Sequence, residues 1–152
     1  MDNIYIIMLV ALFALAITDL VVGVSNDAVN FLNSAIGSKA ISMRTIMIVA
    51  SIGVAVGAIF SSGLMEVARK GIFLPGMFYF DEIMVIFTAV MLTDVLLLDF
   101  FNSLGLPTST TVSIVFELLG ASVAMALIKI GHAGGGLVDV VNYINTTKAT
   151  EI

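Results

Sequence analysis

Long apolar runs constrain the fold of this chain more than any other feature. The first run, Ile4–Val24, carries a single charge, at Asp19. A helix of about 20 apolar residues crosses the roughly 30 Å of hydrocarbon in a bilayer. Three further apolar runs of similar length follow, at residues 41–60, 83–101 and 112–130. We therefore predict an all-α membrane protein, a helical bundle that forms a single transmembrane domain over residues 1–152.

Composition and charge support a membrane protein and exclude other classes. Hydrophobic residues make up 60% of the chain and charged residues 11%, whereas soluble domains average about 25% charged residues. The net charge of −5 disfavours a nucleic-acid partner, and the lack of cysteine excludes thiolate metal sites. No basic residue precedes the first run, which is also too long for a signal peptide. We expect an integral, multi-pass protein of the cell (inner) membrane.

Two polar segments interrupt the apolar pattern. The first, Ser25–Ser38, begins Ser-Asn-Asp-Ala-Val-Asn, and the second, Gly105–Ser113, reads Gly-Leu-Pro-Thr-Ser-Thr-Thr-Val-Ser. Asn and Asp are good N-cap residues, so we predict a short or re-entrant helix that begins at Ala28 and ends near Ser38. Pro107 suits the first turn of another helix. The alternative for the first segment is an ordinary loop between two spans.

The two polar segments occupy equivalent positions in two halves that share one plan: span, polar segment, span. Paired interruptions of this kind are typical of the binding sites of transporters. Irregular backbone within a membrane is tolerated where it is buried in protein or lines a cavity. We therefore expect a bundle with broken or re-entrant helices, in which the two segments face each other and form one ion site.

Side chains in both segments suit an anion. A helix N-terminus presents free N–H groups and a partial positive charge, so two converging N-termini would bind an anion without Lys or Arg. In the first segment, four-residue spacing places Asn26, Asn30 and Ser34 on one helix face. The second segment adds hydroxyl groups. The candidate anion-binding residues are Asn26, Asn30, Ser34, Ser109, Thr110, Thr111 and Ser113.

Asp27 has a different role, because a carboxylate repels an anion unless a cation lies between them. Its oxygens suit a hard cation such as Na⁺, and we expect Asn30 and Thr111 to complete the ligand set. An anion transported together with a cation would explain both kinds of side chain. The same residue types also join helices by hydrogen bonds, so a purely structural role stays open.

Other polar residues give weaker predictions. Asp94 and Asp99 lie about 140° apart around a helix, so we expect one to face the site and the other a partner helix or the interface. Whether Asp19 is functional or reaches the headgroups stays open. Residues 61–70 continue the second span amphipathically. His132 lies in a Gly-rich stretch without a second base, so we predict a solvated residue and no enzyme.

Both polar segments resemble signatures of the inorganic phosphate transporter (PiT) family. Ser25–Asn30 resembles its Ala-Asn-Asp-Val-Ala-Asn motif, and Gly105–Ser113 resembles Gly-Leu-Pro-Val-Ser-Thr-Thr-His-Ser, with Val112 in place of His. The resemblance implies secondary transport of inorganic phosphate coupled to Na⁺ or H⁺, without another cofactor. It also implies that this chain is one half of an inverted-repeat transporter, the N-terminal repeat. Its partner would then be a second repeat or another copy of the chain.

Two other interpretations remain. The residues alone do not separate phosphate from another oxyanion such as sulfate. A membrane scaffold or assembly subunit without transport would also use polar groups to hold its helices together. These interpretations differ in what they predict for Asp27, whose charge is needed for cation-driven transport and not for assembly.

Overall fold

Four long helices make up most of the part of the chain that the structure describes. The computed structural model describes residues 3–61 and 71–151, and the predicted amphipathic segment 61–70 lies almost wholly outside them. Three short helical segments follow the second and fourth long helices. The long helices are α1 (Asn3–Ser38), α2 (Met43–Phe60), α4 (Phe80–Leu104) and α5 (Thr110–Ala133), and the short ones are η1 (Pro75–Met77), η2 (Leu137–Asn142) and α6 (Thr146–Glu151).

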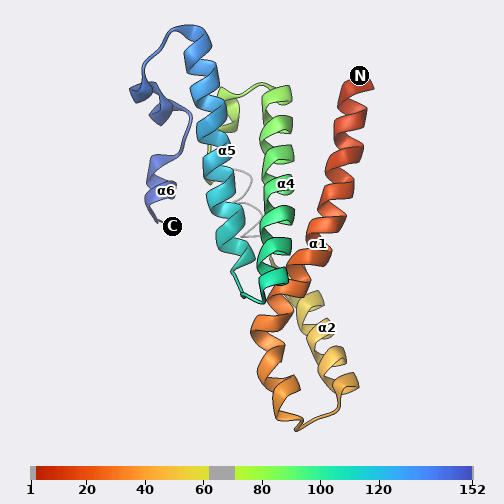
Figure 1. Cartoon of the computed structure of the whole chain (residues 1–152). Coiled ribbons are helices and arrows are strands. Elements are labelled where there is room, and N and C mark those ends of the chain that lie inside the picture. Colours follow the sequence, from red (N-terminus) through yellow and green to blue (C-terminus); the bar gives the residue numbers. More distant parts are fainter. Residues whose placement is uncertain (1–2, 62–70, 152) are drawn as a thin grey trace.

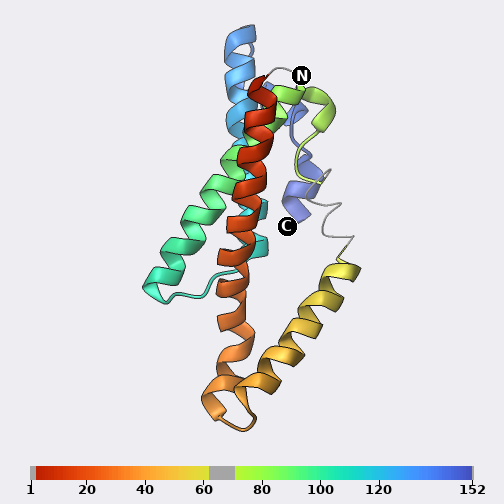
Figure 2. The same ribbon diagram turned by 90° about the vertical axis from the view of Figure 1, so that its right-hand side faces the viewer.

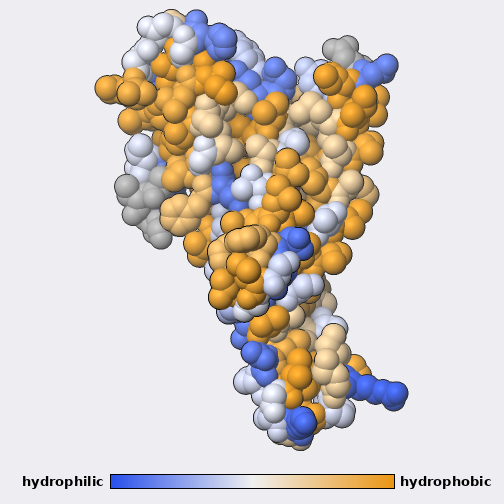
Figure 3. Space-filling view, viewed as in Figure 1, coloured by the Kyte–Doolittle hydropathy of each residue, from blue (hydrophilic) through white to orange (hydrophobic). Residues whose placement is uncertain are grey.

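All four long helices are long and apolar enough to cross a membrane. Within the described residues the only extended pairing is an isolated bridge between Phe73 and Ile144. The prediction of an all-α, multi-pass membrane protein is therefore confirmed. Most side chains of α1 and α2 are exposed, and apolar residues dominate the visible surface (Figure 3). Such a surface needs lipid or other apolar helices around it.

The predicted break in the first helix is wrong. α1 continues through Ser25, Asn26 and Asp27 to Ser38, a length of 36 residues. At 1.5 Å per residue this helix is about 54 Å long, well beyond the roughly 30 Å hydrocarbon thickness. The side chains that suggested an N-cap do not cap their own backbone. Ser25 donates a hydrogen bond to the Val21 carbonyl one turn back, at 2.7 Å, so its hydroxyl group is satisfied within the continuous helix.

The second break is a true interruption between two helices. α4 ends at Leu104, and its C-cap, Gly105, has a φ of 68° and so adopts the left-handed conformation that favours glycine. The chain then runs as a short loop through Pro107 to Ser109, the N-cap of α5. The Ser109 hydroxyl accepts a hydrogen bond from the Val112 N–H at 3.4 Å. The sequence suggested that Pro107 lies in the first turn of the helix, but the residue precedes it.

α1, α4 and α5 pack side by side into a bundle (Figure 1). α1 and α4 run in the same direction, and α5 returns antiparallel to both (Figure 1). The lower part of α1 forms a hairpin with α2 that extends beyond the loop between α4 and α5 (Figures 1 and 2). The Ser25–Asp27 stretch of α1 therefore lies beside the end of α4 and the start of α5.

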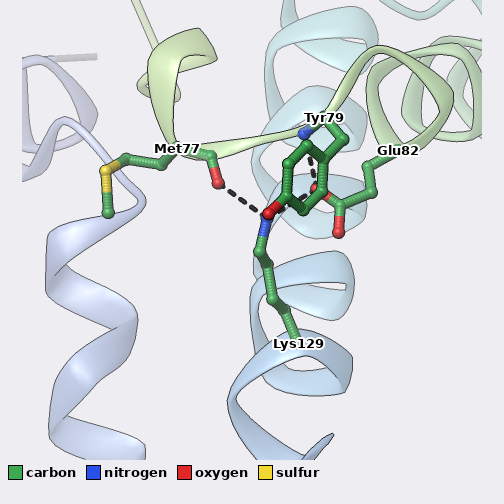
Figure 4. Close-up of polar contacts among 4 residues, drawn as sticks. All are labelled: Met77, Tyr79, Glu82 and Lys129. Carbon is green, nitrogen blue, oxygen red and sulfur yellow. Dashed lines mark hydrogen bonds and ion pairs between the residues drawn. The ribbon is translucent and has the colours of Figure 1, made fainter. Parts of the chain in front are cut away.

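A lysine fixes the upper end of α5 to the start of α4 (Figure 4). Lys129 Nζ lies 2.8 Å from Glu82 Oε2 and donates to the Met77 carbonyl at 3.0 Å. The same ammonium group lies 4.2 Å from the centroid of the Tyr79 ring. Glu82 also accepts from the Tyr79 N–H at 2.7 Å. The charge of Lys129 thus joins three groups at one end of the bundle.

Replacing Lys129 with methionine should lower the stability of this end of the bundle. The stem of the side chain is retained, but the ion pair, the carbonyl hydrogen bond and the cation–π contact are lost. Because both charged groups are partly exposed, the expected loss is on the order of 1 kcal/mol. Thermal unfolding of the purified protein in detergent would measure it. The matched control is Arg44→Met at the exposed start of α2, and an equal loss in both variants would contradict the proposed anchoring.

Candidate ion-binding site

The two polar segments meet inside the bundle, as the sequence predicted. We call the residues that join them the motif cluster: Asn26, Asp27 and Asn30 from α1, Asn102 from α4, and Thr108 and Thr110 from the loop and the start of α5. Segments more than 75 residues apart in sequence are thereby connected through side chains. The α1 side chains reach across to the α4–α5 loop because α1 does not end here.

Asn26 is the centre of the motif cluster and is only 1% exposed. Its side-chain amide donates to Asn102 Oδ1 at 2.9 Å, and its oxygen accepts from the Thr108 N–H at 3.4 Å. Asn102 in turn donates to the Val22 carbonyl at 3.3 Å. These bonds connect α1 to the end of α4 and to the following loop. Each amide keeps one N–H that these bonds do not use.

Asp27 lies at the N-terminal end of α5. The Thr110 hydroxyl donates to both carboxylate oxygens, at 3.0 and 3.2 Å. A carboxylate is favourable at a helix N-terminus, where the backbone carries partial positive charge. The N–H groups of Thr110 and Thr111 have no hydrogen-bond partner within the described part of the chain. Free donors and a carboxylate oxygen therefore lie at the same place.

A small cavity lies next to Asn26, between α1 and the end of α4 with its following loop. Its volume is about 50 Å³, and Asn26, Asn102 and Pro107 are among the residues that line it. A cavity of this size has room for a water molecule, and the side chains of Asn26 and Asn102 are the polar groups of its otherwise apolar lining. Asn30 closes one side of the site by donating to the Thr108 carbonyl at 3.1 Å.

The structure does not bring every predicted residue into direct contact. Ser34 lies two turns beyond Asn26 on α1 and is exposed, and Thr111 is also exposed. Within residues 3–61 and 71–151, the side chains of Ser34, Thr111 and Ser113 make no hydrogen bond to the motif cluster. The Ser109 hydroxyl caps α5. The expected pair of converging helix N-termini is wrong, because α5 is the only one of the described helices that begins at this site.

The sequence prediction missed Asn102. It lies in the last turn of α4, just before the second motif, and contacts both Asn26 and the backbone of α1. Its signal in the sequence is a carboxamide near the end of an apolar run, the same type of residue as Asn26. The two acids in the apolar part of α4 separate as expected, since Asp94 is 1% exposed and Asp99 is exposed. His132 is exposed in the last turn of α5 instead of lying in a loop.

A sequence model described as the phosphate transporter family matches residues 23–148, which include both polar segments. The chain belongs to the phosphate transporter family. Three relatives carry the name "Putative phosphate permease". The protein of Thermococcus kodakarensis is 32% identical over 113 residues, the one of Mycobacterium tuberculosis 31% over 115, and the one of Helicobacter pylori 35% over 104.

These alignments cover most of this chain and a small part of each relative. They span 72, 74 and 67% of the chain and 28, 21 and 20% of the three phosphate transporter relatives, in the same order. No solved structure matches the chain significantly. The family assignment therefore rests on the sequence motifs and their surroundings, and the motif cluster is where those motifs come together.

Proposed function

We propose that the chain takes part in secondary transport of inorganic phosphate, coupled to Na⁺ or H⁺. The observation that carries the proposal is the contact between the two motifs, which brings the Asp27 carboxylate to the free N-terminus of α5. A site with only anion donors would not need the carboxylate. A site with only carboxylates would not need the helix N-terminus.

In this proposal the anion lies at the start of α5. The free N–H groups of Thr110 and Thr111 would donate to phosphate oxygens, with the Thr111 and Ser113 hydroxyls beside them. The cation lies between phosphate and Asp27, with the oxygens of Asn30 and Thr111 as further ligands. The cation removes the repulsion between carboxylate and phosphate, so each ion favours binding of the other. That mutual dependence is the basis of coupled transport.

The proposed site is open on one side, which supports a partner. Asn30, Ser34, Ser109 and Thr111 are exposed, although a transported ion must be surrounded by polar groups when it loses its water. We propose that a second repeat, or a second copy of this chain, supplies the missing wall within a lipid bilayer. The exposed apolar faces of α1 and α2 offer surface for such packing.

Replacing Thr111 with valine should raise the KM for phosphate about tenfold. Valine keeps the shape of the side chain and removes its hydroxyl group. One lost hydrogen bond to a charged ligand costs about 1.5 kcal/mol or more, close to a factor of ten. Initial rates of radiolabelled phosphate uptake at several concentrations would measure the change.

Thr93→Val is the matched control for this test, because Thr93 is exposed on α4 and lies far from the α5 N-terminus. Uptake by the control should keep the wild-type KM. Competition with sulfate in the same assay separates the two oxyanions. Equal competition by sulfate and phosphate would show that the site selects tetrahedral oxyanions in general, and an unchanged KM for Thr111→Val would remove this residue from the site.

A further inference from the structure

A second group of polar side chains crosses the bundle away from the two motifs. It consists of Asp19 from α1, Asp94 from α4 and Glu117 from α5, which we call the acidic layer. Each residue lies about 11 Å along its helix from a residue of the motif cluster. The pairs are Asp19 and Asn26, Asp94 and Asn102, and Glu117 and Thr110, which are seven or eight positions apart. α1 and α4 run in one direction and α5 in the other (Figure 1). All three displacements therefore point toward the same end of the bundle.

Four carboxyl oxygens of the acidic layer are buried without a hydrogen-bond partner among the described residues. Asp94 is 1% exposed, and it faces Asp19, Glu117 and, further away, Asp27. Oδ1 of Asp19, Oδ1 of Asp94 and both Oε atoms of Glu117 are buried and have no hydrogen-bond partner in the described part of the chain. Lys129, the lysine of α5, is bound to Glu82 instead.

Three ionised carboxylates this close together would be strongly unfavourable inside a membrane. Each would lose its hydration, and each would repel the other two. Acidic residues with a structural role at such depth pair with basic groups or with backbone N–H groups. The four buried oxygens of the acidic layer have neither kind of partner among the described residues. A bound cation is therefore needed to balance the charge.

The arrangement suits a proton better than a metal ion. Among residues 3–61 and 71–151, no three acidic or histidine side chains converge closely enough to hold a metal. By contrast, Asp19 and Asp94 lie within hydrogen-bond reach of each other. Two carboxyl groups form a hydrogen bond when one of them carries a proton and donates it to the other. Glu117 approaches the pair from the third helix.

We propose that Asp19, Asp94 and Glu117 form a proton-binding site separate from the motif cluster. Its use in driving transport rests on the proposed function, whereas proton binding itself does not.

An apolar boundary lies between the two sites. Leu98, which is fully buried, lies one turn from Asp94 and one turn from Asn102. Gly23 of α1 packs closely against this leucine, because a Cβ added at Gly23 would lie 3.8 Å from Leu98 and 3.7 Å from Thr110.

Infrared spectroscopy of the reconstituted protein tests the site without any transport. The protein is purified as its host produces it, with any bound partner, and the carboxylic-acid C=O band is followed as the pH is changed. We expect Asp94→Asn and Glu117→Gln each to remove a component of this band. The matched control is Asp99→Asn, an exposed carboxyl group five residues along α4, which should leave that component in place.

These amides resemble the protonated acids in shape and charge, so we expect both variants to fold. If one does not, the other variant and the wild-type titration still decide the matter. The proposal would be overturned if neither Asp94→Asn nor Glu117→Gln removed any part of the carboxylic-acid C=O band of the wild type. A component removed by Na⁺ at constant pH would also overturn it, because the site would then hold a metal ion.

Uptake measurements link the proton site to transport. A proton gradient should accelerate phosphate uptake by the wild type and not by Asp94→Asn, while phosphate–phosphate exchange continues in both. Acceleration of both proteins alike would separate the acidic layer from coupling. If the wild type carries no phosphate, the proposed function fails, and the infrared result still decides whether a proton is bound.

Discussion

Phosphate uptake driven by a cation gradient should fall to background when Asp27 is replaced with asparagine. The substitution keeps the size of the side chain and its ability to accept from the Thr110 hydroxyl, which now donates at 3.0 and 3.2 Å. It removes the negative charge that would hold the cation beside phosphate. Without that cation, transport loses its driving force and phosphate loses a binding partner.

The protein itself should tolerate this change. Asp27 is half-buried, and the hydrogen bond to Thr110 can form with an amide oxygen, so insertion and thermal stability should stay near the wild-type values. Uptake into proteoliposomes and the yield of correctly inserted protein are measured side by side. Asp99→Asn, an exposed acid in α4, is the control. Wild-type uptake by Asp27→Asn would favour the scaffold interpretation.

Replacing Asn26 with leucine should destabilise the bundle as well as stop transport. The side chain is 1% exposed, and its loss leaves Asn102 Oδ1 and the Thr108 N–H without partners. Each unpaired buried group costs about 1–3 kcal/mol, so the variant should lose about 2 kcal/mol or more. Asn33→Leu, at an exposed position of the same helix, should leave stability almost unchanged.

A double-mutant cycle shows whether the loss comes from the Asn26–Asn102 contact. Alanine at both positions should cost less than the two single substitutions added together, with a coupling energy of roughly 0.5–1.5 kcal/mol. Unfolding in a graded series of denaturing detergent would measure the four proteins. Simple additivity would mean that the two amides do not act as a pair, and that the cluster is held by other contacts.

The four long apolar helices could be predicted from the sequence, because long apolar runs have one stable solution in a bilayer. The contact between the two motifs could also be predicted from their equivalent positions. The continuous course of α1 could not. Asn26 and Asp27 have the residue types of an N-cap, and nothing local in the sequence shows that their partners are Asn102, Thr108 and Thr110, from the end of α4 to the start of α5.

The acidic layer shows the same limit. Asp94 and Asp99 differ little in sequence, yet one is buried against α1 and α5 while the other is exposed. Their angular separation predicted different environments without deciding which residue faces inward. The register between helices decides it, and that register depends on packing over the whole bundle, which local patterns do not encode.

Uptake of radiolabelled phosphate into proteoliposomes tests whether this protein carries phosphate together with a cation. The vesicles contain the protein as its host produces it, with any partner chain bound, and uptake is compared with and without an inward gradient of Na⁺ or of protons. We predict uptake above that of protein-free vesicles, accelerated by at least one of the two gradients and reduced to background by Asp27→Asn. Phosphate uptake equal to that of protein-free vesicles, under every gradient, would contradict this prediction.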